Sequence, residues 1–437
     1  MKSYLRMNRR SPAGMTSWKL LVLTLMLAAA LPTHAGAPPA RAAGARLGSA
    51  EQAGFSRERL ERLDAWIEGE IARRRTAGAV VLIARHGKLA WEKAYGLADI
   101  ASGRPMRTDD MFRLYSMTKP ITSVALLTLY ERGRFQLTDP LEQHLPEFRD
   151  VKVYAGVDAA GGMILRAPKR KITIQDVFRH TAGFAYGYFG DGPVDRAYRA
   201  AGIEYGKLDS LTTLVHKLAS MPLEYDPGEQ WVYSFAHDVQ AYLVESYTGM
   251  RFDEYCRKTL FEPLGMADTA FGVPAARAAR FPTTYTRDGA GALKPLAGAD
   301  DPYEHFTEHP FGGVSLSSTP RDYLRFAQML LNGGELNGVR ILGRKTVELM
   351  TSDNLPPGTP TWSGGIRYGL GVSVLTDPAQ AGNLGSKGEY GWSGHATTWV
   401  GIDPKEDLVA LLFAQYLPKD GPFVEELQTL VYQALVK

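Results

Sequence analysis

The sequence predicts an α+β fold in which one antiparallel sheet is built from both chain ends and flanked by helices. Two observations carry this prediction: a β-hairpin pattern near each end of the chain, and a terminal helix beside each hairpin. Strands and helices grouped in this way are typical of layered domains. We expect the sheet region at about 51–134 and 311–437, and a mainly helical region at about 135–310.

The N-terminal elements follow from capping and periodicity. Ser56 is a good N-cap for a helix that continues to about Arg75, with Leu60, Leu63 and Ile67 on one face. Residues 79–84 form an apolar run, residues 89–95 are apolar except for Glu92 and Lys93, and a short polar turn separates the two segments. This pattern predicts two strands joined as a hairpin.

The C-terminal end of the chain shows the same combination of a hairpin pattern and a helix. Residues 397–402 and 408–415 are apolar runs on either side of the Asp- and Pro-containing turn 403–407, and a helical pattern covers about 424–436. The segment between the two sheet regions mixes helical periodicity with many Pro and Gly loops. We therefore expect it to be inserted between the sheet segments.

The first 35 residues have the features of a secretory signal peptide. Residues 1–19 carry five basic residues and no acid, residues 20–31 form an apolar run, and small residues follow at 33–37. An uncleaved membrane anchor is the alternative, although the run is short for a membrane span. We expect a signal peptide at 1–35, a linker at 36–50, a periplasmic or secreted location, and no stable membrane anchor after cleavage.

Composition excludes several classes of function. Without residues 1–35 the chain has 45 basic and 47 acidic residues, which does not indicate nucleic-acid binding. The single cysteine cannot form an intramolecular disulfide, and the nine histidines lack metal-ligand spacing. We expect no metal and no cofactor, and the sequence leaves the oligomeric state open.

The tetrad Ser116-Met117-Thr118-Lys119 is the most informative motif. At the start of a helix it places a hydroxyl and an amine one turn apart on the same face. Pro120 fits the first turn, where a missing N–H does no harm. A desolvated lysine can take the proton of a serine hydroxyl and so make it a nucleophile. The alternative is a helix start with a solvated lysine.

Two further motifs follow in order. They are Tyr233-Ser234-Phe235 and, just before a predicted strand, Gly391-Trp392-Ser393-Gly394-His395. With the tetrad they resemble the serine β-lactamase and penicillin-binding protein superfamily, and most of all family VIII carboxylesterases, which are related to class C β-lactamases. Residues 176–184, 260–269 and 312–322 support this resemblance. It implies a β-lactamase/penicillin-binding-protein-like fold for one serine hydrolase domain at 51–437.

The resemblance also implies roles. Ser116 would attack a carbonyl carbon and become acylated, Lys119 would act as a base or a charge, and Tyr233 would be the second acid or base. Which of Lys119 and Tyr233 takes the serine proton stays open at this point. The backbone N–H groups of Ser116 and His395 would form the oxyanion hole, and Trp392, Ser393 and Gly394 would line the substrate site.

Two departures from the superfamily pattern bear on the substrate. Trp392 stands where lactamases and peptidases usually carry a lysine that holds the substrate carboxylate, and Phe235 stands where they carry an asparagine. Both changes favour neutral esters, because a charge-assisted hydrogen bond and an amide contact are lost. Tyr186 either faces the acyl pocket or packs as a loop aromatic.

The predicted function is hydrolysis of short-chain neutral carboxylic esters, with a small-molecule ester as substrate, through an acyl-enzyme on Ser116. The alternatives are a β-lactamase or D-alanyl-D-alanine peptidase, an acyltransferase that uses the same acyl-enzyme, and a non-catalytic binding protein. The sequence contains no G-x-S-x-G elbow, which disfavours an α/β-hydrolase triad.

Overall fold

The computed structural model describes residues 46–296, 303, 305–417, 421 and 423–437. The predicted signal peptide and most of the predicted linker lie outside these ranges, so export and cleavage remain predictions. Within the described ranges, no helix combines the length and the apolar character that a membrane span requires.

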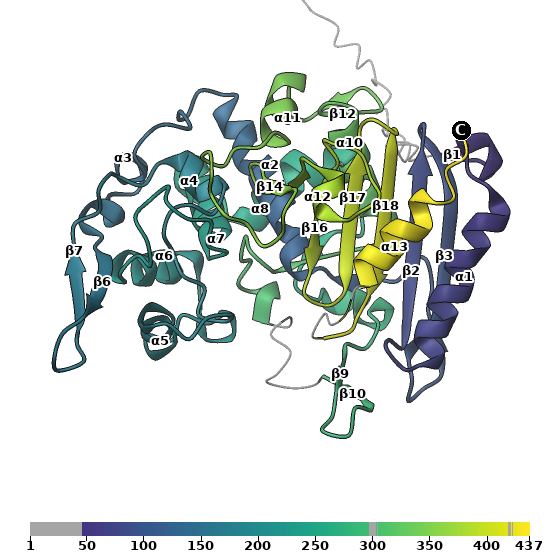
Figure 1. Cartoon of the computed structure of the whole chain (residues 1–437), viewed down its shortest axis with the longest axis horizontal. Helices are drawn as coiled ribbons and strands as arrows, with labels where there is room; N and C mark the ends of the chain where they lie inside the picture. The colour runs from purple at the N-terminus through teal and green to yellow at the C-terminus, as the bar shows by residue number, and fades with distance from the viewer. Residues whose placement is uncertain (1–45, 297–302, 304, 418–420, 422) are drawn as a thin grey trace, which may run out of the picture. The chain divides into compact units, whose positions relative to one another are not determined.

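The main sheet joins the two ends of the chain, as predicted (Figure 1). β2 pairs with β18 in antiparallel register, with Leu82 opposite Leu411. β1 and β3 form a parallel pair at one edge, and β4 pairs with β3. From that edge the strands are β1 (Arg46–Leu47), β3 (Lys88–Asp99), β2 (Gly78–Arg85), β18 (Leu408–Ala414), β17 (Thr398–Asp403), β16 (Tyr390–Gly394), β15 (Ser373–Leu375) and β14 (Ile366–Tyr368), with β4 at Arg104–Pro105.

Most element boundaries lie close to the predicted ones. Helix α1 (Arg57–Ala72) begins after Ser56, whose side chain accepts the N–H of Arg59. Helix α13 (Phe423–Tyr432) is the predicted terminal helix, and it ends earlier than predicted.

The prediction that residues 36–50 form a linker is wrong for the last part of that range. Arg46–Leu47 form β1, and the N–H of Gly48 donates to the carbonyl oxygen of Leu89, so the fold begins before residue 51.

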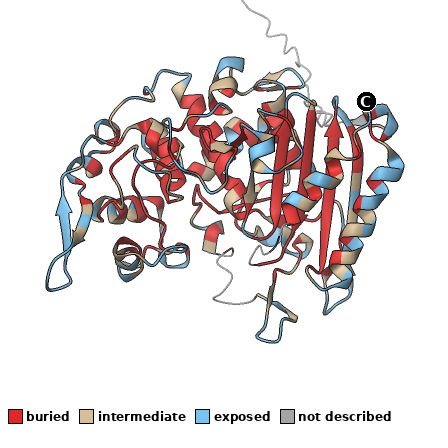
Figure 2. Ribbon diagram, in the orientation of Figure 1, coloured by how far each residue is buried: buried red, intermediate tan, exposed pale blue. Residues whose placement is uncertain are grey.

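The sheet separates two apolar cores. Successive side chains of a strand point to opposite faces, and in β2 Val80 and Leu82 enter one core while Val81 and Ile83 enter the other. The second core lies under α1 and α13. The first core lies against α2 (Thr118–Tyr130), α10 (Pro320–Leu331), α11 (Arg344–Met350) and the helical region. Burial on both faces explains why the central strands are apolar throughout (Figure 2).

The segment 135–310 is less helical than predicted. It contains the hairpin β6–β7 (Val153–Val157 and Met163–Arg166) and the hairpin β9–β10 (Tyr285–Arg287 and Leu293–Pro295). Strand β8 (Ala270–Phe271) joins β5 (Phe112–Arg113) and β11 (Leu316–Ser318) in a small sheet. The helices of this region are α3 (Leu141–His144), α4 (Ile174–Phe178), α5 (Pro193–Ala200), α6 (Leu211–Ser220), α7 (Ala236–Thr248), α8 (Phe252–Cys256) and α9 (Glu262–Leu264).

The third motif is itself a strand, whereas the sequence placed it just before one. Tyr390–Gly394 form β16, in which Gly391 pairs with Gly401 and Trp392 with Val400 of β17. Two glycines and a serine have little intrinsic strand preference, so the pattern was not identifiable from the residues alone. The neighbouring strand imposes the extended conformation, which aligns Gly391 to Gly394 along one strand and leaves His395 in the turn that follows.

Candidate active site

Ser116 lies in a single 3₁₀ turn, Tyr115–Met117, that leads directly into α2. Tyr115, the residue before it, has a φ of 46°, a left-handed conformation that is strained for a tyrosine. The hydroxyl of Thr118 donates to the carbonyl oxygen of Tyr115 at 2.6 Å, and the N–H of Tyr115 donates to the hydroxyl of Tyr303. These bonds hold a strained backbone next to Ser116, and such strain concentrates at functional sites.

Lys119 is fully buried one turn after Ser116. Its Nζ lies 3.3 Å from the Oγ of Ser116 and donates to the carbonyl oxygen of Gly313 at 2.8 Å. Burial disfavours the charged ammonium and lowers the pKa of Lys119 to about 7, against a smaller opposing effect of Asp238. A substantial fraction of Lys119 is therefore neutral at pH 7 and able to accept a proton.

Tyr233 approaches from the loop before α7. The Nζ of Lys119 lies 4.4 Å from the centroid of its ring. The Ser116 hydroxyl and the Trp392 indole N–H are near enough to the Tyr233 hydroxyl to lower its pKa, yet the buried Oη makes no hydrogen bond of normal geometry with any described residue. Burial outweighs both neighbours and raises the pKa of Tyr233 above its ordinary value. Tyr233 is therefore a protonated hydroxyl at neutral pH.

These three side chains come from segments far apart in the sequence and meet in one place. Their pKa values shift in opposite directions: burial lowers the pKa of Lys119 and raises that of Tyr233. This difference favours Lys119 as the group that takes a proton near neutral pH and Tyr233 as the group that gives one.

Asp238, on the first turn of α7, was not identified from the sequence. It is fully buried, and burial raises the pKa of its carboxyl group to about 6. Its oxygens accept the hydroxyl of Tyr205 at 2.8 Å and the N–H of Gly313 at 2.9 Å. Since the carbonyl oxygen of Gly313 accepts an N–H of Lys119, the peptide groups of Gly313 connect the buried Asp238 carboxyl group with the buried Lys119 amine. No known motif spacing places a functional carboxylate five residues after Tyr233, so the sequence did not indicate the role of Asp238.

Two buried histidines pack behind Tyr233. The ring centroid of His180 lies 4.8 Å from that of Tyr233 and 4.8 Å from that of His237, and its Nδ1 is 3.1 Å from the Oγ of Ser234. Burial and the nearby Lys119 lower the pKa of both imidazoles well below the ordinary value. Both histidines are therefore neutral at pH 7, so neither places a second positive charge next to Lys119.

The third motif places a strand edge beside Ser116. A Cβ on Gly394 would collide with the carbonyl oxygen of Leu114, so glycine at this position lets β16 approach the chain just before the serine. The ring of Trp392 lies 5.8 Å from that of Tyr233. Ser393 pairs with Trp399 within the sheet, and His395 follows in the turn after β16, with its ring 6.0 Å from that of Tyr115.

Tyr186 packs directly against Tyr233, and Phe235 packs against Tyr186. The ring of Tyr186 lies 5.3 Å from that of Tyr233, and its hydroxyl donates to Tyr205 at 3.3 Å. Phe235 is fully buried, with its ring 4.8 Å from that of Tyr186. Phe235 was predicted at the substrate, but the structure places it behind Tyr186, where it supports the wall of the site.

In the described ranges, no three His, Cys, Asp or Glu side chains gather in a way that would hold a metal ion. The reactive groups present are a hydroxyl, a lowered-pKa amine and a phenol. This set suits covalent acyl transfer by a serine nucleophile.

Comparisons with known proteins agree with this chemistry. A family model described as Beta-lactamase matches residues 63–433. Esterase EstB of Burkholderia gladioli is 33% identical over 392 residues, which cover 85% of this chain and 94% of EstB.

Among the solved structures with a similar fold, two that are each 25% identical to this chain are informative. Simvastatin Synthase (LovD) from Aspergillus terreus has a TM-score of 0.75 over 87% of this chain and 98% of its own. EstCE1, described as a hydrolase with promiscuous acyltransferase activity, has a TM-score of 0.73 over 86% and 99%. The chain thus belongs to the Beta-lactamase family and has the fold of the serine β-lactamase-related esterases.

Proposed function

We propose that the protein is a serine esterase that cleaves short-chain neutral carboxylic esters through an acyl-enzyme on Ser116. The observation that carries the proposal is the buried Lys119, whose Nζ lies 3.3 Å from the Ser116 Oγ and whose pKa is lowered to about 7. A neutral amine at that distance can activate the hydroxyl.

The two half-reactions use the same three side chains. Neutral Lys119 takes the Ser116 proton as Oγ bonds to the ester carbonyl carbon. The carbonyl–alkoxy bond then breaks, and the leaving alkoxide takes a proton from Tyr233, which recovers one from Lys119. In the second half, water attacks the acyl carbon, its proton passes through Tyr233 to Lys119, and the acid leaves as Ser116 regains its proton. The backbone N–H groups of Ser116 and His395 would stabilise the oxyanion in both halves.

The surroundings of Tyr233 favour a neutral acyl or alkyl group. Trp392 and Tyr186 present flat apolar walls, and the ring of Phe189, whose residue is 70% exposed, lies 5.5 Å from that of Tyr186. Trp392 offers no counter-charge where lactamases and peptidases use a lysine, which makes carboxylate-bearing lactams and peptides poorer substrates.

Intact-mass spectrometry after mixing with p-nitrophenyl butyrate tests the proposal. We expect a mass increase of one butyryl group, located on the peptide that contains Ser116, and slower or no labelling by nitrocefin. Labelling by nitrocefin at a comparable rate would instead favour a β-lactamase. An adduct on any other residue would contradict the mechanism.

An acyltransferase is the second candidate, because the chain resembles LovD and EstCE1 along most of its length. An alcohol in place of water would accept the acyl group from the same intermediate. Adding a primary alcohol to the assay and measuring the new ester against free acid separates the two. Product that stays almost entirely free acid at high alcohol concentration would exclude efficient transfer.

Asp238→Asn is expected to shift the acid side of the pH profile of kcat/KM to lower pH. The Asp238 charge raises the pKa of Lys119, and an amide of the same shape removes that charge, so Lys119 becomes neutral at a lower pH. In the unchanged protein, activity should fall as the pH decreases through about 7, where Lys119 becomes protonated.

The matched control is Asp322→Asn. Asp322 is also buried, with its pKa raised to about 6 by burial, but its partners are Asp268 and Thr269. We expect the control to change stability and leave the midpoint of the pH profile in place. Equal shifts in both variants, or no shift in Asp238→Asn, would show that Asp238 does not set the protonation of Lys119.

A further inference from the structure

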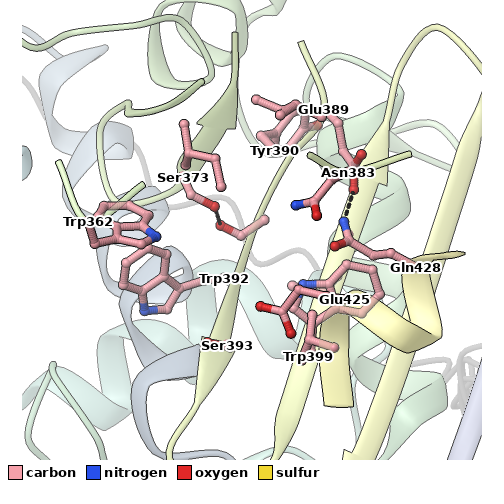
Figure 3. A pocket seen from close by; sticks show the side chains of 16 residues that line it. Trp362, Ser373, Asn383, Glu389, Tyr390, Trp392, Ser393, Trp399, Glu425 and Gln428 are labelled. Carbon is pink, nitrogen blue, oxygen red and sulfur yellow. Dashed lines mark hydrogen bonds between the residues drawn. The ribbon is translucent and has the colours of Figure 1, made fainter. Parts of the chain in front are cut away.

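A cavity lies beside helix α13, on the face of the sheet that α1 and α13 cover (Figure 3). It has a volume of about 170 Å³ and is bordered by β14, β15, β16, β17 and α13. Ser116, Lys119 and Tyr233 are not among the residues that line it. We call this cavity the outer pocket and define it by Trp362, Glu389, Trp392, Ser393, Trp399 and Glu425.

The outer pocket combines negative charge with aromatic walls. Three of its lining residues are tryptophans and two are glutamates, and the described residues that line it include no Lys, Arg or His. Figure 3 shows Trp362 and Trp392 on one side and Glu389 with Gln428 on the other. Trp362 is 48% exposed, a large apolar surface that packing of the fold does not require. Carboxylates and indole faces are the groups that bind organic cations.

Glu389 is held in place at the inner end. It is almost fully buried, its Oε1 accepts the amide of Gln428 at 2.9 Å, and its Oε2 accepts the hydroxyl of Tyr432 at 3.0 Å. Burial and the nearby Asp403 of β17 raise its pKa to about 7, and the two hydrogen-bond donors just named are both uncharged. A cation in the pocket would supply a counter-charge for the ionised form.

We propose that the outer pocket binds a small organic cation of the alkylammonium class, with Glu389 and Glu425 as counter-charges and the tryptophans as walls. Two sources share this chemistry. The cation is either a free effector or the alcohol portion of an ester substrate, which would extend the proposed esterase function from neutral esters to esters of cationic alcohols. The choice between the two rests on that proposed function. The binding itself does not depend on that function.

Trp392 links the pocket to the active site. It lines the outer pocket, and its ring lies 5.8 Å from that of Tyr233. β16 also carries Ser393 into the pocket lining and Gly394 against the chain before Ser116. An occupant would therefore contact the strand on which the proposed oxyanion site depends.

Calorimetric titration with choline tests binding without turnover. We expect saturable binding to the unchanged protein, and binding at least about tenfold weaker for 3,3-dimethylbutan-1-ol, which has the same shape and no charge. Glu425→Gln should weaken choline binding about three- to tenfold, and because Glu425 is exposed this change should not impair folding. Glu426→Gln is the matched control. Glu426 is the next residue of α13, accepts the Trp66 indole N–H and does not line the pocket.

Turnover of butyrylcholine and of 3,3-dimethylbutyl butyrate distinguishes the sources. A preference for the choline ester in kcat/KM that Glu425→Gln abolishes identifies the cation as part of the substrate. Equal turnover of the two esters, with a rate on p-nitrophenyl butyrate that changes as free choline saturates, identifies an effector. The proposal is overturned if choline does not saturate, if the neutral alcohol binds equally well, or if Glu425→Gln binds choline like the unchanged protein. These binding results hold even if no ester is cleaved.

Discussion

Ser116→Ala is expected to lower kcat for p-nitrophenyl butyrate by about 10⁴-fold or more, because the acyl-enzyme can no longer form. The loss should appear in kcat, and the mass adduct on the Ser116 peptide should disappear with it. Steady-state kinetics and intact-mass spectrometry on the same preparation measure both.

Ser123→Ala is the matched control. Ser123 is a buried serine on the same helix, but its hydroxyl donates to the Oε1 of Gln240 and not to the active site. Removing it should cost about 1 kcal/mol of stability and change turnover little. Ester hydrolysis that survives Ser116→Ala at a tenth of the original rate would mean that another group is the nucleophile.

Lys119→Met is expected to lower kcat by about 10³-fold, the order of magnitude that a positioned general base contributes. Methionine has a similar length and no proton-accepting amine, and it leaves the carbonyl oxygen of Gly313 without its 2.8 Å partner. The remaining activity should also lose the pH dependence near 7, since Lys119 is the group that titrates there. A pH series of kcat/KM measures both effects.

Thermal unfolding separates loss of chemistry from loss of fold. Removing the amine leaves the Gly313 carbonyl oxygen without its donor and the buried Asp238 without its neighbouring charge, so the melting temperature should fall while the protein stays folded. Lys345→Met, at an exposed lysine of α11 whose partner is Glu348, controls for the substitution itself. A Lys119→Met protein that folds and keeps the pH profile of the unchanged protein would contradict the role of Lys119 as the base.

The predicted sheet is confirmed, and it was predictable because its central strands are strongly patterned. Residues 79–95 and 397–415 are largely apolar outside their polar turns, with Glu92 and Lys93 as the main exception, and the structure contains both hairpins. The strands that were missed are short or atypical. β14 and β15 have three residues each, β1 has two, and β16 carries glycines. Such segments become strands through their neighbours, which one sequence read alone does not show.

The site was predictable where chemistry depends on residue type and spacing. Ser116 and Lys119 are one helical turn apart, and Tyr233 follows in order, so the three could be named before their geometry was known. The burial of Lys119, and with it the lowered pKa on which its proposed role as a base rests, depends on distant segments. Asp238 meets Tyr205 33 positions away and Gly313 75 positions away, and no local pattern encodes either contact.

The pairing of β2 with β18 has a consequence for how the chain folds. The guanidinium of Arg85 bonds to the carbonyl oxygen of Glu406, 321 positions later, and the two hairpins share one continuous ladder. Contacts this distant close slowly, because a very long loop must first be brought together. The edge of β2 that pairs with β18 therefore stays unpaired until residues 408–414 have been added to the chain and have folded against it. A chain truncated before β18 would leave β2 without its antiparallel partner even though every residue of the Ser116–Lys119 tetrad had been synthesised.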